Sequence, residues 1–437
     1  MTTFLLFALL FTKSTICTQQ DVLRYLATIP YDVDVKPSQN LTTVGIFPNC
    51  FILLQMDQIE ETMTFSGEFL FTWHDPILQW NVSDFEDDVE WVKISSSKIW
   101  QPDVVFTSAT EINDLLGTDS QLAALKYDGS VRTSVPSVVT TSCPLDVTDF
   151  PYDEQYCNVS IGPWFFSKSQ VDVYSKVARV EPLAATFQGN SEWELIEIKA
   201  VQSDNYDITL GITWYSEITY IVHLKRKPVY YVLVIQTPVL IISTLVIFGI
   251  FTPNNSGNER REKTSLGESA YAAIAMMLQL VSNIMPKSSQ LPLLGNYLLA
   301  EVFVLAGALL VSNLLLHIHH SLELMPSCPP TWIQKVFLLD LKYSCSRKVE
   351  EPEAEMTTYN NEVFVVGRGP AIVNEMLSPR TKNEFIEVCK LVHERLIELE
   401  ENEKNRLLWL RIMDRIDFVS LIFFQIANII VSVIFMR

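Results

Sequence analysis

From Val229 to Phe251 the chain contains no charged side chain. About 23 residues in a helix, at ~1.5 Å each, are enough to cross the ~30 Å hydrocarbon core of a bilayer. Three further stretches, Thr264–Met285, Tyr297–Ile318 and Ile416–Met436, are of similar length and mostly apolar. Because backbone groups in lipid must be hydrogen-bonded within their own segment, these stretches predict four membrane-spanning helices.

The second stretch is the most polar of the four, and its small and polar residues follow one side of a helix. They recur at steps of three or four residues, which keeps them on one stripe, while the opposite stripe is apolar. The stripe comprises Ser265, Ser269, Ala272, Met276, Gln279 and Asn283. We expect it to line a water-filled pore enclosed by several copies of the chain. The alternative is a helix buried among the other spans, with its serines hydrogen-bonded internally.

The N-terminal half has a different pattern. From about residue 20 to 225, short runs of alternating apolar and polar residues, such as Thr64–Phe71 and Ile218–Leu224, are separated by turn signals such as Tyr127–Ser130. This alternation predicts an antiparallel β-sandwich, preceded by one or two helical turns near residues 19–28. The apolar start of the chain is too short to span a bilayer, so we interpret residues 1–18 as a signal peptide.

The cysteines and the glycosylation sequons of the N-terminal half are consistent with its export from the cytosol. Cys143 and Cys157 would lie in an oxidising compartment, where they can pair. Asn-X-Ser/Thr sequons begin at Asn40, Asn81 and Asn158, all before the first span, so we expect glycosylation outside the cell.

The predicted fold is an extracellular antiparallel β-sandwich followed by a four-helix transmembrane bundle and a partly helical intracellular domain. The β-sandwich occupies residues 19–227, and helices 1–3 occupy 228–319. The intracellular segment covers 320–414, with an amphipathic helix at about 382–414, and helix 4 covers 415–437. An even number of spans places both termini outside, in a multi-pass protein of the plasma membrane.

Charge and motif content exclude several functions. The net charge of −19 argues against a nucleic-acid partner, because phosphate binding needs a basic surface. An acidic surface near a pore would instead concentrate cations. The sequence contains no phosphate-cradling loop, metal-ligand spacing or nucleophile elbow, so we expect no cofactor, no metal site and no enzymatic reaction.

Six motifs, in order along the chain, resemble those of one family. They are Trp73–Asn81, Lys98–Val105, the Cys143–Cys157 loop with Phe150-Pro151-Tyr152-Asp153 at its tip, Arg226-Lys227-Pro228, Glu262–Gly267, and Ile284-Met285-Pro286. The chain resembles a subunit of the Cys-loop, or pentameric ligand-gated, receptor family and is most similar to the nicotinic acetylcholine branch. The resemblance covers nearly the whole mature chain except residues ~325–380.

The resemblance implies an amine pocket at a subunit interface, where aromatic rings hold a cation. Trp164 matches the central tryptophan and Tyr215 a loop tyrosine, although Trp164 alone is also compatible with a core aromatic. The other ligand-binding candidates are Thr107, Glu68, Tyr206 and Trp214. Thr107 stands where the family has a tyrosine, Glu68 stands where it has a tryptophan, and residues 203–214 lack an adjacent cysteine pair. We therefore expect an amine-like ligand other than acetylcholine.

The resemblance also assigns roles in permeation and coupling. Five copies of Glu262 would form a carboxylate ring that attracts cations, although Arg260 and Arg261 lie beside it. Glu268 would be a second ring or a buried acid paired with a neighbour. Ala272 stands where relatives place a leucine gate, so we expect either a constriction at Met276 or Leu280 or a channel that leaks.

In the coupling region, Phe150, Pro151 and Asp153 would rest against residues 285–288, and Arg226 would pair with an acidic loop residue. Replacement of Arg226 by Gln is then expected to leave surface protein but no ligand-evoked current.

These observations predict a channel subunit, in a homo- or heteropentamer, opened by an extracellular small molecule and permeable to monovalent cations. Three alternatives stay open. The first is a non-conducting or accessory subunit of a hetero-oligomer, and the second is an anion-selective channel. The third is a membrane-tethered enzyme or adhesion domain with incidental spans, against which the polar stripe argues.

Overall fold

The computed structural model describes residues 18–85, 88–117, 120–182, 185–207, 213–252, 257–284, 290–324, 329–330, 333 and 379–435. The chain forms two compact units. The first comprises residues 1–234 with 280–296, and the second comprises 235–279 with 297–437. The predicted signal peptide up to residue 17 and most of the predicted intracellular segment lie outside the described residues.

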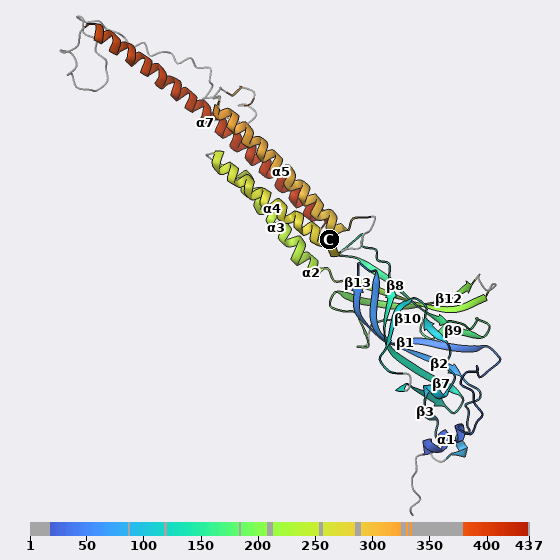
Figure 1. Cartoon of the computed structure of the whole chain (residues 1–437). Helices are drawn as coiled ribbons and strands as arrows, with labels where there is room; N and C mark the ends of the chain where they lie inside the picture. The colour runs from blue at the N-terminus through green and yellow to red at the C-terminus, as the bar shows by residue number, and fades with distance from the viewer. Residues whose placement is uncertain are drawn as a thin grey trace, which may run out of the picture. The chain divides into compact units, whose positions relative to one another are not determined.

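The first unit begins with helix α1 (Thr18–Leu26) and continues with two β-sheets (Figure 1). The larger sheet contains β1 (Thr42–Asp57), β2 (Thr62–His74), β3 (Trp91–Ser95), β5 (Ala109–Asp114), β6 (Leu122–Lys126), β7 (Ser130–Ser142), β9 (Val171–Ser175) and β11 (Phe187–Gln188). Its main path runs β11-β1-β2-β7-β6-β3. The smaller sheet has the order β10-β12-β13-β8-β4 and contains β4 (Val104–Phe106), β8 (Glu154–Pro163), β10 (Arg179–Val180), β12 (Trp193–Asp207) and β13 (Thr213–Arg226).

The sandwich forms because both sheets bury alternate residues. Phe65 and Phe69 of β2 are buried, and Phe69 packs edge-on against Tyr220 of β13 with ring centroids 5.5 Å apart. Tyr220 Oη donates to the Ile46 carbonyl oxygen of β1 at 2.8 Å, which satisfies the hydroxyl inside the core. The predicted β-sandwich is therefore confirmed, with one difference: β1 pairs in parallel with β9 and β11, so the larger sheet is not wholly antiparallel.

The tryptophan motifs form part of this core. Trp73, Trp80 and Trp100 are all buried. Asp75, also buried, accepts hydrogen bonds from Tyr31 Oη at 2.6 Å and from the Ile77 backbone N–H at 2.9 Å. Burial, together with the hydrogen bond to Asp75, raises the pKa of Tyr31 well above its ordinary value. These motif residues therefore belong to the core of the single chain.

Two short 3₁₀ turns, η1 (Val82–Asp84) and η2 (Ser96–Lys98), connect strands of the first unit. The Asn81 side chain caps η1 by accepting from the Ser83 backbone N–H. Asn40, Asn81 and Asn158 are all exposed, although the Asn81 amide nitrogen also donates to Asp84 Oδ1 at 3.4 Å. Exposure is what glycosylation of these three sequons requires.

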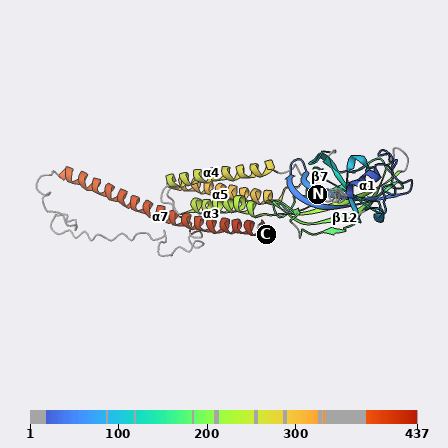
Figure 2. The ribbon, with the colours of Figure 1, turned by 90° about the horizontal axis from the view of Figure 1, so that it is seen from below.

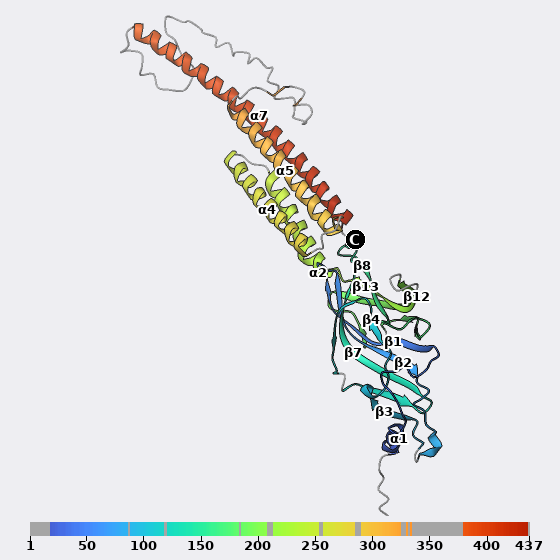
Figure 3. The same ribbon diagram turned by 45° about the vertical axis from the view of Figure 1, so that its right-hand side comes forward.

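The helical part begins with α2 (Val229–Tyr231) and the π-helical turn η4 (Val232–Gln236). It continues with α3 (Thr237–Phe251), α4 (Gly257–Ile284), α5 (Leu293–Leu324) and α7 (Pro379–Phe435), and these four helices lie side by side (Figures 2 and 3). Close packing depends on small residues and stacked rings. A side chain at Gly267 would come within 2.6 Å of Leu309 and 2.7 Å of Ile250, and Phe251 stacks on Phe424 at 5.6 Å.

Within the described residues, three helical segments are long and apolar enough to cross a membrane: Val229–Phe251, Leu293–Ser321 and Glu387–Phe435. They contain the first and third predicted spans and the described part of the fourth. The second predicted span lies in α4, where Glu268, Ser269 and Gln279 lower the hydropathy. Helix α7 is continuous over 57 residues, so the predicted amphipathic helix and the fourth span form one helix.

The second unit contains a buried polar cluster between helices. Glu301 of α5, Asn428 of α7 and Ser243 of α3 are all fully buried. The amide orientation that satisfies the network turns the Asn428 nitrogen toward Glu301, where it donates to Oε1 and Oε2 at 2.9 and 3.2 Å. Thr244 Oγ1 donates to the Asn428 amide oxygen at 3.1 Å. Neutral polar groups on two helices thus surround one acidic side chain of a third.

Candidate functional site

The predicted pore stripe occupies the exposed side of α4. Glu262, Ser265, Ser269, Ala272, Met276, Gln279 and Asn283 are all exposed in the single chain. The opposite side contains Thr264, Gly267, Ile274 and Val281, which are buried against the chain's own residues. Glu268 is exposed, so in the single chain it is not a buried acid.

The other helices expose a different kind of surface. The exposed side chains of α3 include Leu245 and Phe248, those of α5 include Phe303, and those of α7 include Phe423 and Val433. Such side chains are suited to lipid or to apolar partners. The stripe on α4 presents amides, hydroxyls and a carboxylate, and such groups need water or a polar partner.

Several ligand-binding candidates gather at one end of the smaller sheet. Trp164 directly follows β8 and is 61% exposed, which is incompatible with a core aromatic in the single chain. Its backbone N–H donates to the Asp103 carbonyl oxygen at 3.1 Å. Asp103 Oδ2 accepts from the backbone N–H of Phe165 at 2.5 Å and of Phe166 at 3.2 Å. The Asp103 carboxylate therefore fixes the turn that presents the Trp164 indole.

The hairpin formed by β12 and β13 presents two more aromatic rings. Tyr206 and Trp214 are cross-strand partners, their ring centroids lie 5.4 Å apart, and both are about half exposed. Tyr215, the next residue on β13, pairs with Asn205 and points to the opposite face of the sheet. The Lys168 backbone N–H donates to the Trp214 carbonyl oxygen at 2.7 Å, which ties the hairpin to the segment after Trp164.

Thr107 is joined to this region by an acid that sequence reasoning did not select. Thr107 Oγ1 donates to Glu217 Oε1 at 2.5 Å, and Asn205 Nδ2 donates to Glu217 Oε2. Glu68, in contrast, lies on β2 of the larger sheet and accepts from Asn49 Nδ2 at 2.8 Å. In the described part of the chain, no contact joins Glu68 to the cluster around Trp164.

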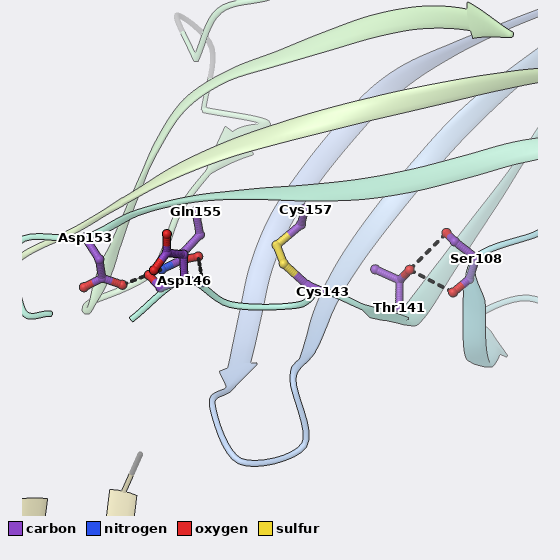
Figure 4. Close-up of a disulfide and its surroundings, with 7 residues drawn as sticks. All are labelled: Ser108, Thr141, Cys143, Asp146, Asp153, Gln155 and Cys157. Carbon is purple, nitrogen blue, oxygen red and sulfur yellow. Dashed lines mark hydrogen bonds between the residues drawn. A yellow bond between two sulfur atoms is a disulfide. The ribbon is translucent and has the colours of Figure 1, made fainter. Parts of the chain in front are cut away.

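The predicted coupling residues lie at the other end of the smaller sheet. Cys143 and Cys157 form a buried disulfide with an S–S distance of 2.03 Å (Figure 4). Gln155 Nε2 donates to the Asp146 carbonyl oxygen and to Asp153 Oδ2, both at 2.7 Å, and Gln155 Oε1 accepts from the Asp146 backbone N–H at 3.0 Å. Gln155 therefore clamps the loop from inside and orients the Asp153 carboxylate.

Arg226 ends β13, and its side chain is fully buried. Its Nε and Nη2 donate to Asp153 Oδ1 and Oδ2 at 2.7 and 3.1 Å, and its Nη1 donates to Glu192. The guanidinium also lies over the rings of Trp193 and Phe150, 4.0 and 4.7 Å from their centroids. A planar guanidinium suits this site because it can bind a carboxylate with two nitrogens and stack on aromatic rings at the same time.

The groups around Arg226 also contact residues at the start of helices α2 and α5. Tyr231 of α2 donates its hydroxyl to Glu192 Oε1 at 2.8 Å and packs its ring on Phe150 at 4.6 Å. The Phe150 carbonyl oxygen accepts from the Leu294 backbone N–H at 3.1 Å.

The disulfide loop contacts the start of α5 and the residues just before it. The Thr148 carbonyl oxygen accepts from the Leu293 backbone N–H at 3.0 Å, and Thr148 Oγ1 donates to Gln290 Oε1 at 3.3 Å. Pro151 is buried behind this contact. The predicted partner of the loop, residues 285–288, lies outside the described residues.

Residues that sequence reasoning missed include Gln155, Glu192, Glu217 and Tyr231. Glu192 lies 34 positions from Arg226, and the Thr107–Glu217 contact spans 110 positions. Only Gln155 had a local signal, because it stands two positions from Asp153 and Cys157 inside the disulfide loop.

Residues 19–228 match the family described as the neurotransmitter-gated ion-channel ligand binding domain, which defines the class of the β-sandwich unit. Neuronal acetylcholine receptor subunit alpha-3 of Carassius auratus is 29% identical over 313 residues, covering 70% of this chain and 59% of the relative. Subunit alpha-6 of Mus musculus is 28% identical over 337 residues, covering 76% and 66%. Subunit alpha-4 of Mus musculus is 31% identical over 288 residues, covering 65% and 44%.

The chain thus spans about half to two thirds of the length of these relatives. Its β-sandwich unit belongs to this ligand-binding-domain family, and the chain is similar to nicotinic acetylcholine receptor subunits, at modest identity.

Proposed function

We propose that this chain is a subunit of a pentameric ligand-gated ion channel of the plasma membrane. An extracellular amine-like molecule opens it, and monovalent cations pass through it. The observation that carries this proposal is the division of α4 into an exposed polar stripe and a buried apolar side.

The stripe favours a pore for energetic reasons. Amide, hydroxyl and carboxylate groups such as those of Gln279, Ser269 and Glu262 are costly to place in hydrocarbon without partners. Several copies of α4 arranged around an axis would direct these groups into water, while the apolar faces of α3, α5 and α7 meet lipid. A symmetric ring of identical subunits provides that arrangement.

Selectivity for cations rests on Glu262, which is exposed at the N-terminal end of the stripe. A ring of carboxylates raises the local cation concentration and repels anions. Replacement by Gln tests this, because the reversal potential should move away from the cation value in ion-substitution recordings. An unchanged reversal potential would favour an anion-selective pore or a selectivity filter elsewhere.

The ligand assignment rests on Trp164, Tyr206, Tyr215 and Trp214, whose rings offer cation-binding faces. The relatives are named as acetylcholine receptor subunits, which supports a cationic ligand. Thr107 in place of an aromatic residue removes one wall of the amine box, so we do not propose acetylcholine itself. Glu68, on the other sheet, would close the site from a neighbouring subunit.

Cysteine accessibility tests the pore directly. Cysteines introduced at Ser265, Ser269 and Met276 are expected to react with small aqueous thiol reagents and to reduce the current. A cysteine at Ile274, on the buried side of the same helix, is the matched control and is expected not to react. If the three stripe positions do not react in any state, α4 does not line an aqueous pore.

A second candidate is an accessory subunit that conducts only with a partner chain. The specific observation that favours it is the incomplete aromatic site, with Thr107 and Glu68 at two of its positions. Expression of the chain alone, and then with a related subunit, separates the two. Current only on co-expression supports the accessory role.

Enzymatic removal of glycans from Asn40, Asn81 and Asn158 tests whether the β-sandwich lies on the extracellular side of the membrane.

A further inference from the structure

The carboxylate of Glu217 differs from three other acids of the smaller sheet, which have basic partners in the described part of the chain. Asp204 pairs with Lys168, Glu197 with Arg179, and Glu154 with Lys225 and His223. Glu217 instead accepts from two neutral groups, the Thr107 hydroxyl and the Asn205 amide. Over the described ranges, no lysine, arginine or histidine pairs with it, so its negative charge is uncompensated.

The strand register places this charge near Trp164 and Tyr215. β13 runs antiparallel to β8, with Ile218 opposite Ile161, and the two strands lie side by side (Figure 3). The Glu217 Cα and Cβ lie 3.5 and 3.7 Å from the point where a Cβ of Gly162 would stand, so Glu217 lies over a residue without a side chain. Trp164 lies two positions beyond Gly162, directly after the neighbouring strand β8. Tyr215 lies two positions before Glu217 on the same face of β13.

The hydrogen bonds that hold Glu217 leave room for another donor. A carboxylate has about four acceptor positions, and the two neutral donors use two of them. An ammonium N–H that reaches a third would form a charge-assisted hydrogen bond, which is about twice as strong as a neutral one. A quaternary ammonium group has no N–H and is held only by the ring faces and by the field of the charge.

We propose that Glu217 is the counter-charge of the bound ligand, and that the site prefers a protonated primary or secondary amine over its fully N-methylated counterpart. This inference rests on the proposed function and specifies the ligand class of the same site. Thr107 contributes to this preference. It stands where the family has a tyrosine, and its hydroxyl donates to the Glu217 carboxylate, so a hydrogen-bonded charge takes the place of one aromatic ring of the ligand site.

The variant Glu217→Gln tests the charge and keeps the shape. Gln can accept from Asn205 and exchange a hydrogen bond with Thr107, so the ties between these segments are retained. The full-length assembly in detergent would be titrated with phenethylamine and with trimethyl(phenethyl)ammonium, and binding would be followed by tryptophan fluorescence. We expect the unsubstituted protein to bind the primary amine more tightly, and the variant to lose about tenfold to a hundredfold for that amine alone.

Two controls separate charge from structure. Asp204→Asn removes a nearby carboxylate that Lys168 already neutralises, and it should leave the ratio of the two affinities unchanged. Thr107→Val removes one tie to Glu217 but keeps the charge, so the primary amine should still bind more tightly than the quaternary one.

Three results would overturn the proposal: equal losses for both compounds in Glu217→Gln, tighter binding of the quaternary compound to the unsubstituted protein, or no binding of either. None of them decides whether α4 lines a pore, because cysteine labelling of α4 tests the pore without any ligand.

Discussion

Arg226 in the first unit and Glu301 in the second are both fully buried, but their surroundings differ in kind. Arg226 contacts two carboxylates and two closely stacked rings, so its charge is neutralised and its donors are used. Glu301 contacts an amide and hydroxyl groups, and within the described residues no basic side chain pairs with it. The first centre is built on charge and the second on hydrogen bonding.

This difference predicts how strongly a substitution in each buried cluster lowers stability. Removing one partner of a buried ion pair leaves the other charge desolvated and unpaired, which is strongly destabilising. Replacing an acid that has only neutral partners by its amide keeps the shape and most of the hydrogen bonds. Replacing the charged residue by Gln should therefore destabilise the Arg226 site strongly and the Glu301 site only slightly.

The largest effect is expected for Arg226→Gln. Asp153 and Glu192 would keep their charges without a cation, which costs about 3–5 kcal/mol. Ligand-evoked current should disappear, as the sequence predicted, but burial also leads us to expect less protein at the cell surface than the sequence suggested. Surface biotinylation and current recordings measure the two losses separately. The double variant Arg226→Gln/Asp153→Asn should recover part of the surface amount, and full surface expression of the single variant would contradict a charge-based centre.

A smaller effect is expected for Asn428→Leu. The substitution keeps the branched shape at a larger volume and removes the amide that donates to Glu301, so the buried carboxyl loses that donor at a cost of about 1–3 kcal/mol, to which overpacking adds. Thermal unfolding of the detergent-solubilised chain measures this as a lower midpoint. Leu298, buried and apolar, offers a control at Leu298→Met, which should lower the midpoint less.

A change below about 1 kcal/mol is expected for Glu301→Gln, because the amide can still bond to Asn428 and Ser243. The same unfolding measurement applies. A loss as large as that of Arg226→Gln would show that Glu301 is held by charge, and the contrast between the two centres would fail.

The smallest effect concerns an exposed charge. Hydrogen bonds from Lys225 and then His223 lower the pKa of Glu154 below its ordinary value of 4.5. A lowered pKa means that the stabilising contribution is present above pH 4.5 and is lost as the pH falls through the folded-state value. Solvent screens this group, so the drop in the unfolding midpoint below pH 4.5 should be slight, and Glu154→Gln should remove it.

The sequence predicted the elements of this molecule better than their contacts. Alternation in Thr64–Phe71 and Ile218–Leu224 indicated strands, and the uncharged run Val229–Phe251 indicated a helix, because these signals repeat over a few residues. The parallel pairings of β1, the Glu192–Arg226 contact and the Glu301–Asn428 contact join distant positions that no local period encodes. At the site, Trp164 and Arg226 followed from motifs, whereas Glu217 did not, since its role depends on Thr107 and Asn205.

Strand β13 joins the two ends of the first unit. It contains Tyr215 and Glu217 near its start and Arg226 as its last residue, and both of its edges are hydrogen-bonded, to β12 and to β8. At ~3.3 Å per residue, Glu217 and Arg226 are separated by about 30 Å of extended backbone. A chain segment paired on both sides has little freedom to stretch or bend. A ligand bound near Glu217, as proposed, would therefore meet a strand whose other end contacts Asp153 and Glu192 through Arg226, so an axial displacement of this one strand would reach the residues that precede α2.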